Sequence, residues 1–196
     1  MTEVLIAHGA TGALFSFISA YVNKGDQVVS FTPMFQFYYD QCEMAGGVMK
    51  TVNLNYSDGN WTFDPSELRN ALASGSTKVL ILNNPHNPTG KVFAREELET
   101  ISLILDDFPE VLVIADEVYE FLTYDSKPHH FFASIRDNWS RTVSIYSGGK
   151  LFSCTGWRIG WVIGPEALLR LGGIIQNAAV FNATTPCQVA MARSFD

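Results

Sequence analysis

One lysine and one arginine, eight residues apart, give this chain its clearest potential for chemistry. Lys150 ends the turn Ser147-Gly148-Gly149-Lys150, which directly follows an apolar run, and Arg158 ends Thr155-Gly156-Trp157-Arg158. A lysine amine becomes a nucleophile toward aldehydes when desolvation or a neighbouring cation favours its neutral form. The Arg158 guanidinium and the Ser147 hydroxyl are suited to hold a phosphate. A ligand with both an aldehyde and a phosphate would use all three groups, so we predict pyridoxal 5'-phosphate as the cofactor.

The apolar runs of the chain and the amphipathic stretches between them predict the scaffold that must position these groups. The runs predict strands at Val4–Ala7, Gln27–Phe31, Val48–Val52, Lys78–Leu82, Val111–Ala115, Thr142–Tyr146 and Ile159–Ile163. The amphipathic stretches predict helices at Thr11–Val22, Phe35–Ala45, Pro65–Leu72, Arg95–Asp106 and Pro165–Asn177. Strands that are apolar on both faces and separated by helices are typical of a mostly parallel sheet covered on both sides. We therefore predict one α/β domain over residues 1–196, with three α-β-α layers and a mostly parallel seven-stranded sheet.

Two local signals refine this scaffold. Between Tyr146 and Ile159 the chain is too short for a helical crossover once the Lys150 turn is subtracted, so we predict that the last strand is antiparallel. In Asp64-Pro65-Ser66-Glu67, the aspartate is expected to cap the helix that follows, and Glu67 to complete a capping box.

The residues that follow each strand test the cofactor prediction, because open α/β sheets bind ligands at the carboxyl ends of their strands. The first strand is followed by His8-Gly9-Ala10-Thr11-Gly12, a turn of small residues that leads into a helix. Exposed backbone N–H groups and the helix dipole favour an anion at such a turn. Glycine-rich turns between strand and helix are common, so this segment could also be an ordinary connection.

Two other strand ends carry polar groups. The segment Asn84–Gly90 contains two Asn-Pro steps, which make a rigid loop that could aim an amide inward or could be a plain tight turn. Asp116 ends a buried strand and needs a cationic partner to stay ionised, and a protonated pyridine nitrogen would be such a partner. The Tyr119 hydroxyl could reach the ring oxygen. Alternatively, Asp116 could cap a helix and Tyr119 could belong to the core.

Composition excludes several classes of protein. The net charge is −7 without a cluster of Lys and Arg, which argues against nucleic-acid binding. No apolar run reaches the ~18 to 20 residues of a membrane span, and the N-terminus lacks the basic and apolar regions of a signal peptide. Cys42, Cys154 and Cys187 lack metal-ligand spacing, so we expect reduced, unpaired thiols, no metal, and a cytoplasmic protein.

The motifs together resemble the class I/II aminotransferases, which are fold-type I pyridoxal-phosphate enzymes. Within them the chain is most similar to the group of kynurenine aminotransferase, glutamine transaminase K and cysteine-S-conjugate β-lyase. The resemblance runs along nearly the whole chain. It is carried by Gly25-Asp26, the stretch Trp61 to Leu68, Asn84 to Phe93, Asp116-Glu117-Val118-Tyr119, and Gly156-Trp157-Arg158-Ile159-Gly160-Trp161.

The resemblance implies a role for each candidate residue. Lys150 would bond covalently to the cofactor and then move a proton between the substrate Cα and the cofactor. Asp116 would pair with the pyridinium nitrogen, and Tyr119 and Asn87 would hydrogen-bond the phenolic oxygen. The remaining roles are phosphate binding by the backbone of Ala10 and Thr11 with Ser147 and Arg158, ring stacking by Phe35, substrate-carboxylate binding by Asn87, and lining of the partner subunit's substrate pocket by Phe181.

The resemblance also implies a reaction and an assembly. The reaction would pass an amino group from an amino acid, such as kynurenine or glutamine, to a 2-oxo acid, with β-elimination from cysteine conjugates as a further outcome. Family members are homodimers and are longer at both ends, so we expect a large domain truncated at both ends. Arg193 lies in the wrong segment to match the family's arginine for the substrate carboxylate. A missing N-terminal segment would leave mitochondrial targeting open.

Two alternatives stay open at this point. The chain could bind the cofactor without turning over a substrate. A nucleotide-binding domain built on Gly9–Gly12 is a weaker alternative, because the chain lacks a G-x-G-x-x-G pattern, a Walker lysine and an acidic ribose contact.

Overall fold

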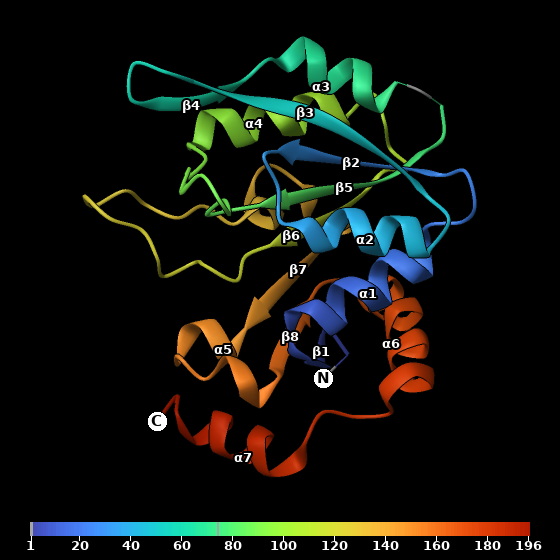
Figure 1. Cartoon of the computed structure of the whole chain (residues 1–196), viewed down its shortest axis with the longest axis vertical. Helices are drawn as coiled ribbons and strands as arrows, with labels where there is room; N and C mark the ends of the chain where they lie inside the picture. Colours follow the sequence, from blue (N-terminus) through green and yellow to red (C-terminus); the bar gives the residue numbers. More distant parts are fainter. Residues whose placement is uncertain (1, 74) are drawn as a thin grey trace.

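The computed structural model describes residues 2–73 and 75–196 and shows a central sheet between two layers of helices (Figure 1). The sheet has eight strands in the order β1-β8-β7-β6-β5-β2-β3-β4. The strands are β1 Val4–His8, β2 Gln27–Thr32, β3 Val48–Ser57, β4 Asn60–Phe63, β5 Thr77–Asn83, β6 Leu112–Asp116, β7 Thr142–Ser147 and β8 Ile159–Ile163. The helices are α1 Gly9–Tyr21, α2 Gln36–Met44, α3 Pro65–Leu72, α4 Arg95–Leu105, α5 Gly148–Leu151, α6 Glu166–Val180 and α7 Thr185–Arg193. Short 3-10 turns occur at Phe132–Ser134, Asn138–Arg141 and Thr155–Trp157.

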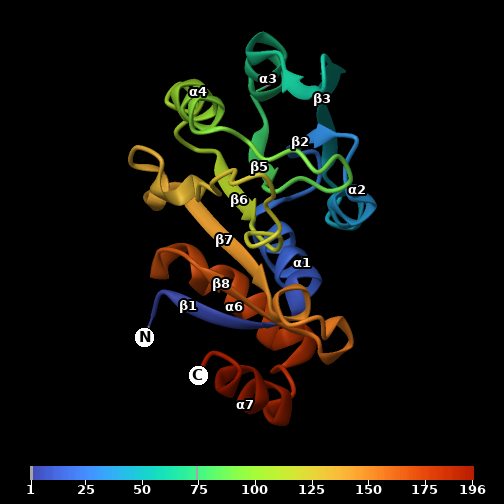
Figure 2. The ribbon, with the colours of Figure 1, turned by 90° about the vertical axis from the view of Figure 1, so that its left-hand side faces the viewer.

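The two helical layers follow from the alternation of side chains along the strands. In β5, Leu80 and Leu82 pack into a core with α3 and α4, whereas Val79 and Ile81 pack into a core with α1, α2 and α6. Successive strand residues point to opposite faces of a sheet, so a strand buried on both faces is apolar throughout. Helices α1 and α4 accordingly lie on opposite sides of the strands (Figure 2). The predicted three-layer α/β architecture is confirmed.

The strand directions bring distant segments to one edge of the sheet. Strand β8 runs antiparallel to both β7 and β1, as predicted, and β2, β3, β5, β6 and β7 are mutually parallel. Consequently β1, β5, β6 and β7 all end at the same edge. The register places Asn83 beside Asp116, and Gly160 beside both Ser147 and Ala7. The segments that follow these four strands carry predicted site residues, and they therefore begin side by side at this edge of the sheet.

The predicted number of strands is wrong, because β4 is an eighth, short strand that pairs antiparallel with the second half of β3. Strand β3 itself runs to Ser57, five residues beyond the predicted end. The turn between β3 and β4 is Asp58-Gly59, and both residues have positive φ angles, 51° and 81°. Asp-Gly between two short strands is the typical signal of a tight hairpin, so this feature was readable from the sequence.

The start of α3 differs from the prediction in one contact. Asp64 caps the helix as expected, because its side chain accepts a hydrogen bond from the Ser66 N–H at 2.8 Å. The predicted capping box is wrong: the Glu67 carboxylate instead accepts from the backbone and side chain of Asn53, at 3.1 and 2.7 Å. Glu67 thus ties α3 to β3 rather than to its own first turn.

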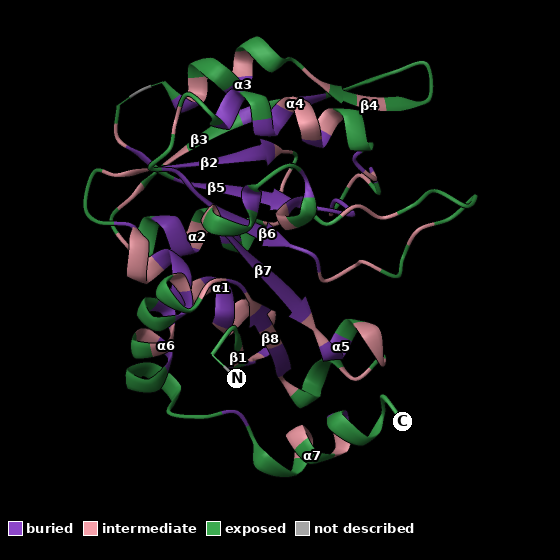
Figure 3. Ribbon diagram, turned by 180° about the vertical axis from the view of Figure 1, so that it is seen from behind, coloured by how far each residue is buried: buried purple, intermediate pink, exposed green. Residues whose placement is uncertain are grey.

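Burial decreases from the strands outward. The central strands are buried, whereas the outer faces of α3, α6 and α7 are exposed (Figure 3). Helix α7, which was not among the predicted helices, ends at Arg193. Across residues 2–73 and 75–196, no helix combines the length and the apolar character needed to cross a bilayer.

Candidate active site

A cavity of about 230 Å³ lies where the carboxyl ends of β1, β5, β6 and β7 meet. It is lined by all the residues for which sequence analysis predicted a cofactor contact: Ala10, Thr11, Phe35, Asn87, Asp116, Tyr119, Ser147, Lys150 and Arg158. These residues come from six separate segments of the chain. The structure therefore brings the predicted set together, while their individual roles remain predictions.

One end of the cavity is suited to an anion. Ala10 and Thr11 lie in the first turn of α1, where backbone N–H groups have no partners within the helix. Arg158 lines the same cavity, and its Nη1 donates to the Thr155 carbonyl at 3.1 Å. Ser147 caps α5 by accepting from the Lys150 N–H at 3.3 Å, which leaves its hydroxyl proton for another acceptor. These hydrogen-bond donors and the guanidinium charge suit an anion such as phosphate.

Two glycines make the close approach at this end possible. Gly9 begins α1 with φ of 70°, and a Cβ there would lie 2.6 Å from Arg158 Nη2. A Cβ on Gly160 in β8 would lie 2.8 Å from the backbone N of Ala10. Both positions must therefore lack a side chain for the guanidinium and β8 to reach the start of α1. Arg158 itself has a left-handed backbone, with φ of 54°.

Asp116 is suited to a cation. The side chain is buried, and burial raises the pKa of its carboxyl to about 6. The Tyr38 hydroxyl opposes that increase by donating to Oδ2 at 2.5 Å, and the Val118 N–H donates to Oδ1 at 3.4 Å. The neighbouring Glu117 raises the pKa further, whereas Lys150 lowers it. A cationic ligand beside Asp116 would restore its ionised form.

Tyr38 is a site residue that the sequence analysis missed. It is fully buried in α2, three residues after Phe35, and the two rings meet edge to face with centroids 5.7 Å apart. Burial and the neighbouring Asp116 raise the pKa of the Tyr38 hydroxyl well above its usual value, so it is a permanent donor. Residues three apart share a helix face, and that spacing from Phe35 was the available signal. Asn83, Leu14, Val118 and Thr155 also line the cavity without having been predicted.

Between the two ends lie the amine and two polar side chains. Lys150 is exposed in the short helix α5, and its Nζ lies 5.6 Å from the centre of the Tyr119 ring. Asn87 Nδ2 donates to the Tyr119 hydroxyl at 3.5 Å. The strand order β1-β8-β7-β6-β5 places Lys150, after β7, between the start of α1 on one side and Asp116 at the end of β6 on the other.

Glu117 and His86 lie close in sequence to the site but do not line the cavity. Glu117 Oε2 is 2.7 Å from Nε2 of the buried His129, and burial raises the pKa of Glu117 while His129 opposes the increase. His86 Nδ1 lies 2.8 Å from the Thr89 hydroxyl. Burial lowers the pKa of His86 to about 4, so the ring is neutral at pH 7.

Phe181 is the one predicted site residue that the structure does not bring to the cavity. It follows α6 and is 80% exposed. Its predicted contact is with a partner subunit, so that role stays a prediction. Arg193, at the end of α7, is also exposed and does not line the cavity.

The fold and this site define a class of protein, and comparison with known families agrees. The chain belongs to the family "Aminotransferase class I and II", whose model matches residues 1–196. It is 40% identical to "Kynurenine--oxoglutarate transaminase" of Dictyostelium discoideum, over 98% of this chain and 47% of that protein. It is also 40% identical to "Kynurenine--oxoglutarate transaminase 1" of Homo sapiens, over 100% of this chain and 48% of that protein.

Solved structures agree with the family assignment. N-Succinyldiaminopimelate aminotransferase from Mycobacterium tuberculosis superposes with a TM-score of 0.95 at 36% identity, covering 100% of this chain and 50% of that one. The structure of "Bna3p, a Putative Kynurenine Aminotransferase from Saccharomyces cerevisiae" superposes with a TM-score of 0.93 at 34% identity, covering 98% of this chain and 47% of that one. The chain thus spans about half the length of the curated relatives it matches.

Proposed function

We propose that these 196 residues form the cofactor-binding part of a pyridoxal 5'-phosphate-dependent aminotransferase. The observation that carries this proposal is the single cavity lined by Lys150, Asp116 and Arg158 together with the start of α1. The names of the relatives suggest kynurenine as amino donor and 2-oxoglutarate as acceptor. Glutamine is a second candidate donor, and β-elimination from cysteine conjugates a further reaction. A homodimer is part of the same proposal.

The residues fit this cofactor at each of its chemical groups. Arg158, Ser147 and the first turn of α1 would bind the phosphate. The Asp116 carboxylate would accept a hydrogen bond from the protonated pyridine nitrogen, and Tyr119 and Asn87 would donate to the phenolic oxygen. Phe35 would cover one face of the ring. The glycine at position 9 is a further sign of an anion site. Any side chain at this position would collide with the Arg158 guanidinium, so the glycine allows that cation to lie against the first turn of α1.

The side chains divide the chemistry among them. When bound, pyridoxal 5'-phosphate supplies an aldehyde that condenses with amines and a ring that withdraws electrons. Lys150 would supply the amine that reacts with the aldehyde, and its Nζ would be the base that takes up a proton from the substrate Cα and returns it. The anionic Asp116 would keep the ring nitrogen protonated. Tyr119 and Asn87 would orient the ring oxygen, and Asn87 would also bind the substrate carboxylate.

A direct experiment tests the proposal. The purified chain is titrated with pyridoxal 5'-phosphate, binding is followed by visible absorbance, and the sample is reduced with borohydride and mapped by mass spectrometry. We expect one cofactor per site and a label on Lys150. A chain that neither changes the cofactor spectrum nor becomes labelled at that residue would contradict the proposal.

Removing the guanidinium should weaken phosphate binding selectively. Arg158→Ala is expected to weaken pyridoxal 5'-phosphate binding about 10- to 100-fold, because charged hydrogen bonds contribute about 1.5–3 kcal/mol. Pyridoxal, which lacks the phosphate, provides the control ligand, and its affinity should hardly change. Equal losses for the two ligands would show that Arg158 supports the fold of the site rather than the phosphate.

Removing the Tyr38 hydroxyl should shift the pH dependence of binding. Tyr38→Phe takes away a hydrogen bond that stabilises the Asp116 carboxylate, so the pKa of Asp116 should rise above about 6. The pH below which cofactor affinity falls should therefore move upward, as measured by titrations between about pH 5 and 8. Tyr39→Phe is the matched control, because Tyr39 is the next residue and is 42% exposed. Superimposable profiles for Tyr38→Phe and wild type would refute the assignment.

A second candidate function is cofactor binding without turnover. It is favoured by the cavity lining, in which Arg158 is the one arginine among the described residues, so that no second guanidinium is present there for a substrate carboxylate. A labelled Lys150 without amino transfer to any 2-oxo acid would support this reading.

A further inference from the structure

The loop between β5 and α4 carries Asn87 but belongs to neither a strand nor a helix. Much of its backbone is satisfied internally: the His86 N–H donates to the Lys91 carbonyl and the Gly90 N–H to the His86 carbonyl, both at 2.8 Å. The Asn87 N–H donates to Asn83 Oδ1 at 2.7 Å. These internal hydrogen bonds make the loop compact. The position of Asn87 therefore depends on how the end of the loop nearer to α4 is fixed.

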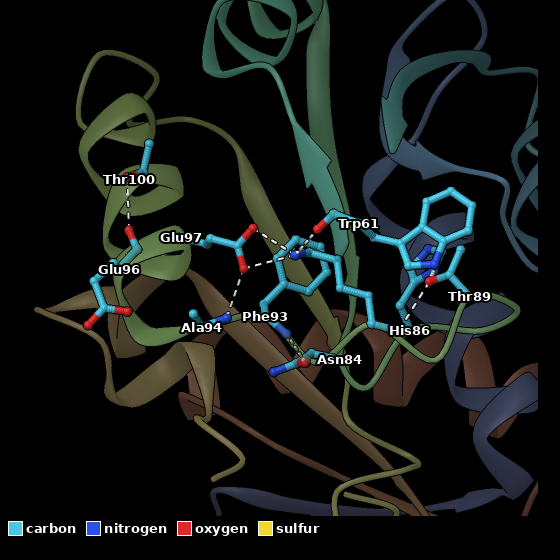
Figure 4. Close-up of polar contacts among 10 residues, drawn as sticks. Trp61, Asn84, His86, Thr89, Phe93, Ala94, Glu96, Glu97 and Thr100 are labelled. Carbon is cyan, nitrogen blue, oxygen red and sulfur yellow. Dashed lines mark hydrogen bonds and ion pairs between the residues drawn. The ribbon is translucent and has the colours of Figure 1, made fainter. Parts of the chain in front are cut away.

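That end of the loop is fixed by a buried ammonium. Lys91 has a side chain only 7% exposed, and its Nζ donates to the Trp61 carbonyl at 2.6 Å and to both oxygens of Glu97 at 2.7 and 2.9 Å. Glu97 also accepts from the Ala94 N–H at 2.9 Å. Trp61, Ala94 and Glu97 converge from β4, the end of the loop and the first turn of α4 (Figure 4). All three protons of one ammonium therefore join these elements.

The loop is held on its inner side as well. Asn84 Oδ1 accepts from the Phe93 N–H at 3.0 Å, and its Nδ2 donates to the His130 carbonyl at 3.2 Å. Between this inner bond and the Lys91 ammonium, the segment that follows Asn87 has little freedom to shift. A buried ion pair adds little stability over apolar residues of similar size, but it requires one geometry. We therefore expect the Lys91–Glu97 pair to fix the position of the loop rather than to raise the free energy of unfolding.

We propose that the Lys91–Glu97 ion pair is a positioning device that holds Asn87 against Tyr119 at the cofactor. The proposal rests on the proposed function, since it assigns the pair to the same pyridoxal 5'-phosphate site. Neither residue lines the cavity, so the pair acts only through the loop. Its loss should release the Asn87 amide from its contact with the Tyr119 hydroxyl and weaken cofactor binding indirectly.

The test is a double-mutant cycle on cofactor affinity. Lys91→Met/Glu97→Leu removes both charges and leaves neither unpaired, so we expect it to fold, as checked by circular dichroism and melting. It should bind pyridoxal 5'-phosphate about 10-fold more weakly than wild type. In an Asn87→Ala background, the same double substitution should cost little further affinity. Arg95→Met/Glu99→Leu is the matched control, because that pair begins on the same helix and is largely exposed.

The outcomes separate the two proposals. Unchanged affinity in Lys91→Met/Glu97→Leu, or a loss that simply adds to that of Asn87→Ala, would overturn the positioning role. Should the double variant not fold, Glu97→Gln keeps the shape and acceptor oxygen, and unchanged affinity there would overturn it equally. A wild-type chain that does not bind the cofactor would instead overturn the proposed function, and this inference with it.

Discussion

Lys150→Ala is expected to abolish covalent attachment of pyridoxal 5'-phosphate. The reason is that the cavity presents this amine between the predicted phosphate donors and Asp116. After borohydride reduction the variant should carry no label, whereas wild type should be labelled at one residue. In the whole enzyme, loss of the proton-transferring amine alone should lower the turnover rate about 10²- to 10⁴-fold. The measurements are mass spectrometry of the reduced protein and single-turnover kinetics.

The control for this experiment is a lysine elsewhere on the surface. Lys24 is exposed at the turn before β2 and does not line the cavity, so Lys24→Ala should be labelled like wild type. Reversible binding should persist in Lys150→Ala, because the phosphate donors and Asp116 remain. Labelling of another lysine in the variant, or undiminished turnover, would remove Lys150 from the centre of the mechanism.

The sheet shows which features of a fold are readable from local sequence. Runs such as Ile159–Ile163 are apolar over their full length, and the structure places that strand at the predicted residues. Its antiparallel direction followed from chain length alone. The hairpin strand Asn60–Phe63 has only four residues and lies at the edge of the sheet, where burial no longer forces an apolar pattern. Its apolar pattern therefore gave no signal, and the Asp58-Gly59 turn was the one local indication of it.

The site shows a second limit. Residues at the ends of strands or within a few positions after them, such as Asp116 and Lys150, were predictable because parallel strands end at one edge. Tyr38 was not selected, because its function depends on how α2 packs against β6. Its spacing from Phe35 alone does not single it out, since Tyr39, four residues after Phe35, fits the same helix face. The Lys91–Glu97 pair is similar: the sequence shows two charges six residues apart, and only tertiary packing makes a buried lysine the partner of a partly buried glutamate.

Asp116→Asn should separate stability from function. In the protein without cofactor, burial raises the pKa of Asp116 from 3.8 to about 6. Between these pH values the folded chain holds a proton that the unfolded chain has released, so stability falls as pH rises through this window and the cost persists above it. At 1.36 kcal/mol per pKa unit, the cost is on the order of 3 kcal/mol. Above about pH 6 the cofactor-free variant should therefore melt higher than wild type.

The same substitution should damage the cofactor site. A neutral amide cannot hold the ring nitrogen in its protonated form, and loss of one partner of a buried ion pair costs about 3–5 kcal/mol, or about 10²- to 10⁴-fold. We expect that loss in Cα proton transfer, while labelling of Lys150 should persist. Wild-type affinity should also fall below about pH 6, as Asp116 takes up a proton, and the variant should lack this step. A variant that is both less stable above pH 6 and unimpaired in proton transfer would show that Asp116 is a structural residue. A higher melting temperature together with slower Cα proton transfer would show that the buried Asp116 charge destabilises the cofactor-free fold and serves the cofactor.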